Sequence, residues 1–189
     1  MKRSAFFSIL CAISLLFALA GCQSQTVTPA DKAAFLTVSD LRAFGYANPK
    51  PPAGKWSKTG YGDGTYDMDY EIDTAESELT WPLYLSETLS DEKNSKDALA
   101  YLATTRGAQN LIFKSQKMIE TAMPNQTIYG DGSSLTVLRD GKTAVGNIFS
   151  ARKKGRTFSL IISGFVFEDP KEWDDFAGKK INAWLDGAK

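Results

Sequence analysis

The predicted fold depends on two elements within residues 158–187, FSLIISGFVFEDPKEWDDFAGKKINAWLDG. Residues 158–167 are almost continuously apolar, which is typical of a strand covered on both faces. Asp169 then stands at an N-cap position, Pro170 occupies the first helical position, and Gly187 is placed to end the helix. The apolar residues between them recur at helical spacing on one face: Trp173, Phe176, Ala177, Ile181, Trp184 and Leu185. This stretch predicts a central strand followed by an amphipathic helix.

The segments upstream predict further antiparallel strands. Asp140-Gly141 is a strong hairpin signal between residues 135–139 and 143–152, and a second turn at 153–155 leads into the apolar strand. These three segments therefore predict a meander. Residues 66–72 alternate apolar and acidic side chains, which favours a half-exposed strand. Pro82 interrupts the next apolar segment, residues 81–85, and a proline there favours an edge strand.

Helical spacing appears between residues 90 and 122, with a capping signal at Ser90, a break at Arg106-Gly107 and Pro124 after its end. The predicted fold class is α+β. We expect an antiparallel sheet of about five strands with amphipathic helices packed on it, as an α/β/α sandwich. The alternative is a helix-grip fold, in which a curved sheet and the C-terminal helix enclose a cavity.

The N-terminus has the pattern of a secretory signal. Lys2 and Arg3 precede an apolar run over residues 5–20, which is shorter than the roughly 20 residues that span a bilayer. The run ends in Leu19-Ala20-Gly21-Cys22, which resembles the lipobox of bacterial lipoproteins. The resemblance implies that the Cys22 thiol takes a diacylglycerol, that the chain is cleaved before Cys22, and that the new amino group is acylated. Two or three acyl chains give stable membrane anchoring.

The resemblance also implies an address in the bacterial cell envelope. Gln23, directly after the cysteine, is similar to the residue that accompanies sorting to the outer membrane in Gram-negative bacteria. We expect a membrane-anchored protein, on the outer membrane and facing the periplasm if the host is Gram-negative.

Three segments follow from this interpretation: a signal peptide at 1–21, a lipidated tether at 22–32, and a single α+β domain at 33–189. Residues 23–31 are polar and contain Pro29, which favours a flexible tether. Removal of residues 1–21 from the 189-residue chain leaves 168 residues, the size of one ordinary domain.

Short motifs in the domain resemble a second group of proteins. Residues 36–41 (LTVSDL), Asp97-Ala98, residues 130–133 (GDGS) and the closing hairpin and helix are similar to small bacterial lipoproteins of the PsbP/Mog1-like type. This resemblance implies an α/β/α sandwich and a role as an adaptor or sensor.

Composition excludes several kinds of chemistry. The chain has no histidine, and its two cysteines are Cys11 in the signal and Cys22 at the lipidation position. These absences exclude Ser-His-Asp and Cys-His sites, zinc on His or Cys ligands, haem held by His, and thiol redox chemistry. The mature chain carries 20 basic and 22 acidic residues, so nothing in its charge favours nucleic acid. We expect no enzyme, no catalytic residue, no cofactor and no metal ligand.

Two groups of charged residues are candidate binding sites. The first is an acidic row that consists of Asp63, Asp67, Asp69, Glu71, Asp73, Glu76 and Glu78. This acidic row could offer oxygen ligands to Ca²⁺ but lacks the spacing of a calcium loop, so a solvated strand face is favoured. The basic residues fall at two hairpin ends, on opposite sides of a meander, and predict no continuous patch; they are Arg139, Lys142, Arg152, Lys153, Lys154 and Arg156.

The predicted function is a non-catalytic binding or interaction module with an envelope protein as its partner. The alternative is a carrier or sensor of an apolar small molecule, held between the sheet and the last helix. A large apolar cavity would favour the carrier, and a filled core would favour the interaction module. A third class, a carboxylate-dependent hydrolase, needs two acids facing each other in a cleft.

Overall fold

The computed structural model describes residues 22–47, 53–73 and 83–188. Several sequence predictions lie outside these residues. They are the signal peptide at 1–21, the last two members of the acidic row, Glu76 and Glu78, and the start of the strand predicted around Trp81 and Pro82.

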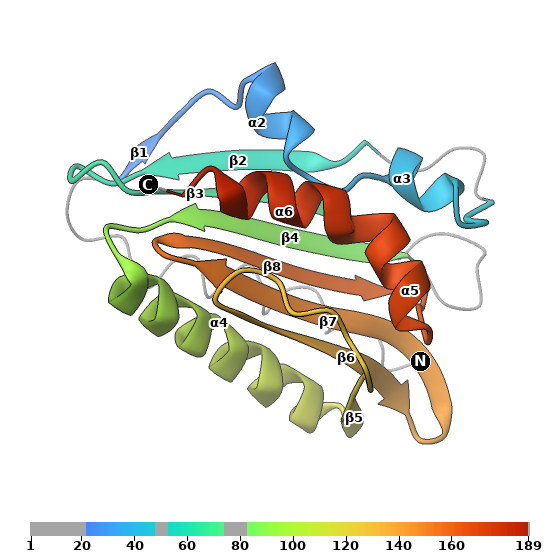
Figure 1. Ribbon diagram of the computed structural model, residues 1–189. Helices are drawn as coiled ribbons and strands as arrows, with labels where there is room; N and C mark the ends of the chain where they lie inside the picture. The colour runs from blue at the N-terminus through green and yellow to red at the C-terminus, as the bar shows by residue number, and fades with distance from the viewer. Residues whose placement is uncertain (1–21, 48–52, 74–82, 189) are drawn as a thin grey trace.

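The described residues form one eight-stranded sheet in which every neighbouring pair is antiparallel (Figure 1). The strand order is β1-β2-β3-β4-β8-β7-β6-β5. The strands are β1 Gln23–Ser24, β2 Lys55–Gly60, β3 Tyr66–Asp73, β4 Tyr84–Asp91, β5 Met118–Ala122, β6 Gly132–Asp140, β7 Thr143–Lys153 and β8 Arg156–Ser163.

The predicted sheet of about five strands with amphipathic helices packed on it is therefore wrong. Three of the eight strands were missed, namely β1, β2 and β5. β1 lies in the predicted tether, and β5 lies in a segment whose apolar spacing predicted helix. The helix ends before β5 because Lys117 adopts the left-handed conformation at φ 61°, after which the chain runs extended along β6.

The prediction that the strand near Pro82 is an edge strand is also wrong. β4 pairs with β3 on one side and with β8 on the other. Its last residues, Ser90 and Asp91, belong to the strand and do not start a helix. The helix α4, Ser95–Ser115, begins instead at Asn94, whose side chain accepts hydrogen bonds from the backbone of Lys96 and Asp97.

α4 is continuous through Gly107 and less amphipathic than its sequence predicts. Its buried residues are Ala98, Leu102, Gln109 and Phe113. Leu99 and Leu111, which belong to the predicted apolar stripe, are 53% and 72% exposed. The helix packs on β7 and β8 through a small cluster formed by Phe113 with Tyr84, Leu138, Val145, Ile148 and Ile161.

The C-terminal helical segment covers the other face of the sheet (Figure 1). It consists of α5 Pro170–Trp173, a π-helical turn η1 Asp174–Gly178 and α6 Lys179–Asp186. The predicted start and stop are confirmed: Asp169 accepts from the backbone of Lys171 at 2.8 Å, and Gly187 is the C-cap. All six residues of the predicted apolar face are buried, at 0–7% exposure.

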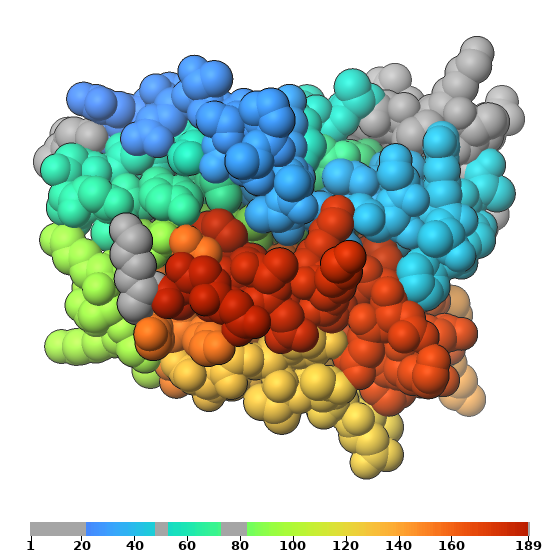
Figure 2. Space-filling view, turned by 45° about the horizontal axis from the view of Figure 1, so that its top comes forward, coloured from blue at the N-terminus to red at the C-terminus, as the bar shows by residue number. Residues whose placement is uncertain are grey.

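The helix-grip alternative does not describe this packing either, because the space between the sheet and the C-terminal segment is filled. Trp173 lies against Phe149, Phe167 and Phe176, with ring centroids 5.2–5.8 Å apart. The short helices α2, Pro29–Ala33, and α3, Val38–Arg42, lie on the same side of the sheet. Figure 2 shows the C-terminal segment flanked by these N-terminal residues and by the residues that precede β6.

Candidate functional site

Cys22, the predicted lipidation residue, lies at a corner of the sheet. It is exposed and directly precedes β1, which pairs with the end of β2 in the register Gln23↔Gly60 and Ser24↔Thr59. The backbone N–H of Gln25 extends this pairing by donating to the carbonyl of Lys58 at 2.9 Å. The predicted lipidation position is therefore adjacent to a paired strand.

Much of the predicted tether, residues 22–32, packs on the domain. Thr28 and Asp31 form a capping box at the start of α2. Asp31 also pairs with Lys58 of β2 at 2.9 Å, and both side chains are only 14–15% exposed. Burial alone would raise the pKa of Asp31, but hydrogen bonds from Thr28 and Lys58 hold it below its ordinary value.

The cysteine belongs to one end of the sheet, here called the anchor end. A single row of cross-strand partners marks it: Gln23↔Gly60↔Tyr66↔Asp91↔Arg156↔Lys153. The turn between β2 and β3, residues 61–65, lies beyond this row, as does the β7–β8 turn. Arg156 brings the end of α6 to the same place by donating to the carbonyl of Trp184 at 2.8 Å.

Most of the charges at the anchor end are paired with one another. Four ion pairs lie there among the described residues: Asp63–Lys93, Asp91–Arg156, Asp131–Arg152 and Asp186–Lys153. At the other end of the meander, Arg139 pairs with Glu168 at 2.7 Å. The predicted absence of a continuous basic patch is consistent with this arrangement. The acidic partners come from distant segments that the local sequence around the hairpins does not reveal.

The acidic face of β3 is not the solvated face that the alternation favoured. Asp67 accepts from the Tyr61 hydroxyl at 2.7 Å, and Asp69 accepts from Ser57 and Thr88 at 3.0 and 2.8 Å. Burial raises the pKa of Asp67 to about 7, although hydrogen bonding to Tyr61 and to Tyr101 of α4 opposes the rise. Because two residues along a strand are about 7 Å apart, the two carboxylates do not converge. Within the described ranges, no cluster of three or more acidic, His or Cys side chains could hold a metal ion.

A second buried carboxylate was missed by the sequence analysis. Glu87 on β4 is fully buried, and both its oxygens accept from the backbone N–H of Leu36, at 3.0 and 3.1 Å. Burial raises its pKa well above the ordinary value. Nearby, Lys180 of α6 pairs with Asp40 at 2.8 Å and donates to the carbonyl of Phe35. This network joins the N-terminal segment, β4 and α6. Its role is therefore structural.

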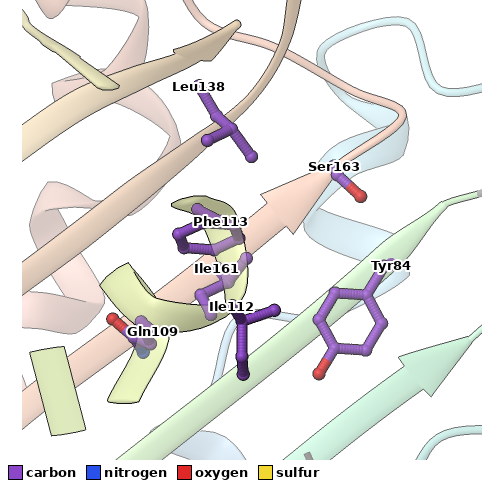
Figure 3. Close-up of a pocket in the computed structure, with 7 residues that line it drawn as sticks. All are labelled: Tyr84, Gln109, Ile112, Phe113, Leu138, Ile161 and Ser163. Carbon is purple, nitrogen blue, oxygen red and sulfur yellow. The ribbon is translucent and has the colours of Figure 1, made fainter. Parts of the chain in front are cut away.

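A small pocket lies between α4 and the sheet (Figure 3). It is lined by Tyr84, Gln109, Ile112, Phe113, Leu138, Ile161 and Ser163. Its volume is about 10 Å³, which is roughly the space that one water molecule needs. Sites for small molecules usually enclose about 300–1,000 Å³, so this pocket is not a ligand site of ordinary size.

Comparison of the chain with protein-family models, with curated proteins and with solved structures finds no match. The resemblance to bacterial lipoproteins therefore rests on the residues around Cys22. Among the helices of the described residues, none has both the length and the apolar character that crossing a bilayer requires.

Proposed function

We propose that this protein is a lipid-anchored, non-catalytic interaction module of the bacterial cell envelope, held to the membrane through Cys22. On this proposal its partner is another envelope protein, which adds a strand to the free edge of β5. The exposed, apolar edge of β5 is the observation that carries the proposal.

In the described part of the chain, β5 pairs with β6 on one side and has no strand on its other side. Natural proteins usually protect such an edge with charged side chains, a proline or a bulge. β5 instead presents Ile119, which is 53% exposed, together with exposed Thr121 and Ala122. Its one charged residue, Glu120, pairs with Arg106 of α4 at 2.6 Å and is 22% exposed.

These features suit recognition by strand addition. Main-chain hydrogen bonds to a free edge supply affinity, and exposed side chains on the edge supply specificity. The opposite edge of the sheet is covered at the anchor end by β1. Seven spacings of about 4.8 Å separate the outer strands, so β5 lies roughly 34 Å from β1 across the sheet, and a partner reaches it without meeting the membrane anchor.

The carrier alternative gains no support from the described residues. A carrier of an apolar molecule needs a cavity comparable in size to its ligand. The space under the C-terminal segment is filled by Trp173, Phe149 and Phe167, and the pocket under α4 has a volume of about 10 Å³.

The test is site-specific photocrosslinking of the lipidated protein in its native envelope. A benzophenone side chain at Thr121, on the free edge, should give a discrete protein adduct that mass spectrometry identifies. The same group at Leu99, which is 53% exposed like Ile119 but lies on the outer side of α4, is the matched control.

Ile119→Lys should abolish the Thr121 adduct, because a lysine on a strand edge opposes pairing. Circular dichroism of this variant checks that it remains folded. Adducts of equal yield from positions 121 and 99, or an adduct that survives Ile119→Lys, would contradict recognition through β5.

A further inference from the structure

We propose that β1 acts as a rigid anchor mount, which stands the domain on the bilayer with the anchor end of the sheet against the lipid headgroups. This inference rests on the proposed lipidation of Cys22. It goes beyond the proposed function because it names the surface that faces the membrane.

The distance between the acylated residue and the sheet is the first argument. Gln23, the residue directly after Cys22, is already paired with Gly60. One residue of chain spans at most about 3.6 Å. A flexible tether of 11 residues would have a root-mean-square span of about 18 Å and would let the domain tumble above the bilayer. A paired β1 removes that freedom.

The contacts that hold the mount are the second argument. β1 is followed by the Gln25–Lys58 backbone hydrogen bond and by the Asp31–Lys58 ion pair, which is largely buried. Lys58 also lies over the ring of Tyr66, 4.7 Å from its centroid. Gln25 packs so closely on Gly60 that a Cβ at position 60 would lie 1.9 Å from its side-chain amide nitrogen. The N-terminal segment is therefore fastened to β2 and β3 at several points.

The charge balance of the anchor end indicates which interaction orients the domain on the bilayer. Eight ionic side chains of the anchor end form four pairs, and the two others beside the β7–β8 turn, Lys154 and Glu92, are opposite in sign, so this surface has little net attraction for anionic headgroups. The acyl chains and the short mount must then orient the domain. The orientation should consequently be insensitive to ionic strength and to the content of anionic lipid.

The opposite end of the sheet points away from the bilayer in this arrangement. The 11 residues of β7 connect the β6–β7 turn, which contains Lys142, to the anchor end. At about 3.4 Å per residue, Lys142 lies roughly 35 Å from the anchor end. Two labels, one at each end, will therefore report the orientation.

The experiment uses lipidated protein purified and reconstituted in phosphatidylcholine vesicles. Cys22 is the only cysteine after residues 1–21 are removed, and its thiol carries the lipid, so an added cysteine can be labelled alone. Gly62→Cys places a fluorophore at the anchor end, where a Cβ meets no atom within 4 Å. Lys142→Cys places it on the exposed β6–β7 turn. Nitroxide in the headgroups then quenches whichever label is close.

We expect quenching at position 62 to exceed quenching at position 142 several-fold, with no change between low and high salt. A flexible Gly-Ser insertion of about 12 residues between Cys22 and Gln23, spanning about 20 Å, should remove most of this difference. The same insertion between Gly141 and Lys142 is the matched control and should leave quenching at position 62 unchanged.

Mass spectrometry of the same samples separates the two proposals. If Cys22 carries no lipid, the proposed anchoring fails and the orientation fails with it. If the lipid is present but both labels are quenched equally, or the insertion after Cys22 has no effect, the rigid mount is refuted and the lipid anchor stands.

Discussion

Trp184 is the residue at which the packing of the C-terminal helix is tested most directly. It is 7% exposed, its Nε1–H donates to the carbonyl of Thr157 at 2.7 Å, and the guanidinium of Arg156 lies 4.3 Å from its ring centroid. Truncation of a buried tryptophan costs about 3–5 kcal/mol. Because Trp184→Ala also removes the hydrogen bond and the cation–π contact, we expect the upper part of this range.

The assay is urea unfolding of the chain from residue 22 onward, with Cys22→Ser to prevent lipidation. With an m-value of about 2 kcal/mol per molar urea, a loss of 4–5 kcal/mol lowers the midpoint by about 2 M. Trp184→Phe keeps a ring on Arg156 but loses the Nε1–H donor, so we expect an intermediate loss of about 1–2 kcal/mol.

The control must be chosen from the structure. Lys180 looks exposed from the sequence pattern alone, yet it pairs with Asp40 and is unsuitable. Lys179 is exposed, and Lys179→Ala should change stability by less than about 0.5 kcal/mol. A midpoint for Trp184→Ala within about 0.3 M of wild type would refute the reasoning, since the apolar face would then not be core.

Three further predictions concern the anchor, metal and pH. Cys22→Ser should abolish incorporation of labelled fatty acid and leave the chain uncleaved or mislocalised; wild-type protein that takes up no label would overturn the lipoprotein assignment. EDTA should leave the melting temperature of the unlipidated chain unchanged, and a drop of several degrees would reveal a bound cation. Burial raises the pKa of Asp67 from 3.8 to about 7, so between these values the folded state keeps a proton that the unfolded chain has lost. Stability should therefore fall as pH rises through this window, by up to roughly 4 kcal/mol. Asp67→Asn should flatten that part of the profile and raise the urea midpoint at pH 8, and a lower midpoint at pH 8 would count against it.

Much of the C-terminal half could be predicted from the sequence because its signals are local. The cap at Asp169, the stop at Gly187 and the hairpin at Asp140-Gly141 each depend on residues a few positions apart. The nearly continuous apolar run over residues 158–167 predicted a central strand, because such runs are typical of strands covered on both faces, and β8 does have a neighbour on each side, although it ends at Ser163. The candidate anchor, Cys22, also came from a local motif.

The size of the sheet was decided by the tertiary structure. β1, β2 and β5 lack a clear alternation of their own and become strands through hydrogen bonds to their partners in the sheet. Apolar spacing could not separate the end of α4 from β5, because the backbone turn at Lys117 is not visible in that spacing. Strand order likewise came only from packing, which placed β4 in the middle of the sheet in spite of Pro82.

The sequence alone determined the order of the C-terminal elements, the absence of histidine chemistry and the position of the predicted lipid. The tertiary structure alone decided the surroundings of the charges and of the anchor. Asp67 and Glu87 are ordinary acids in the sequence, and burial changes their pKa values only after distant segments cover them. Cys22 similarly lies next to the sheet because β1 pairs with β2. The physical reason is the same in each case: burial and strand pairing depend on which distant residues meet, and local patterns do not contain that information.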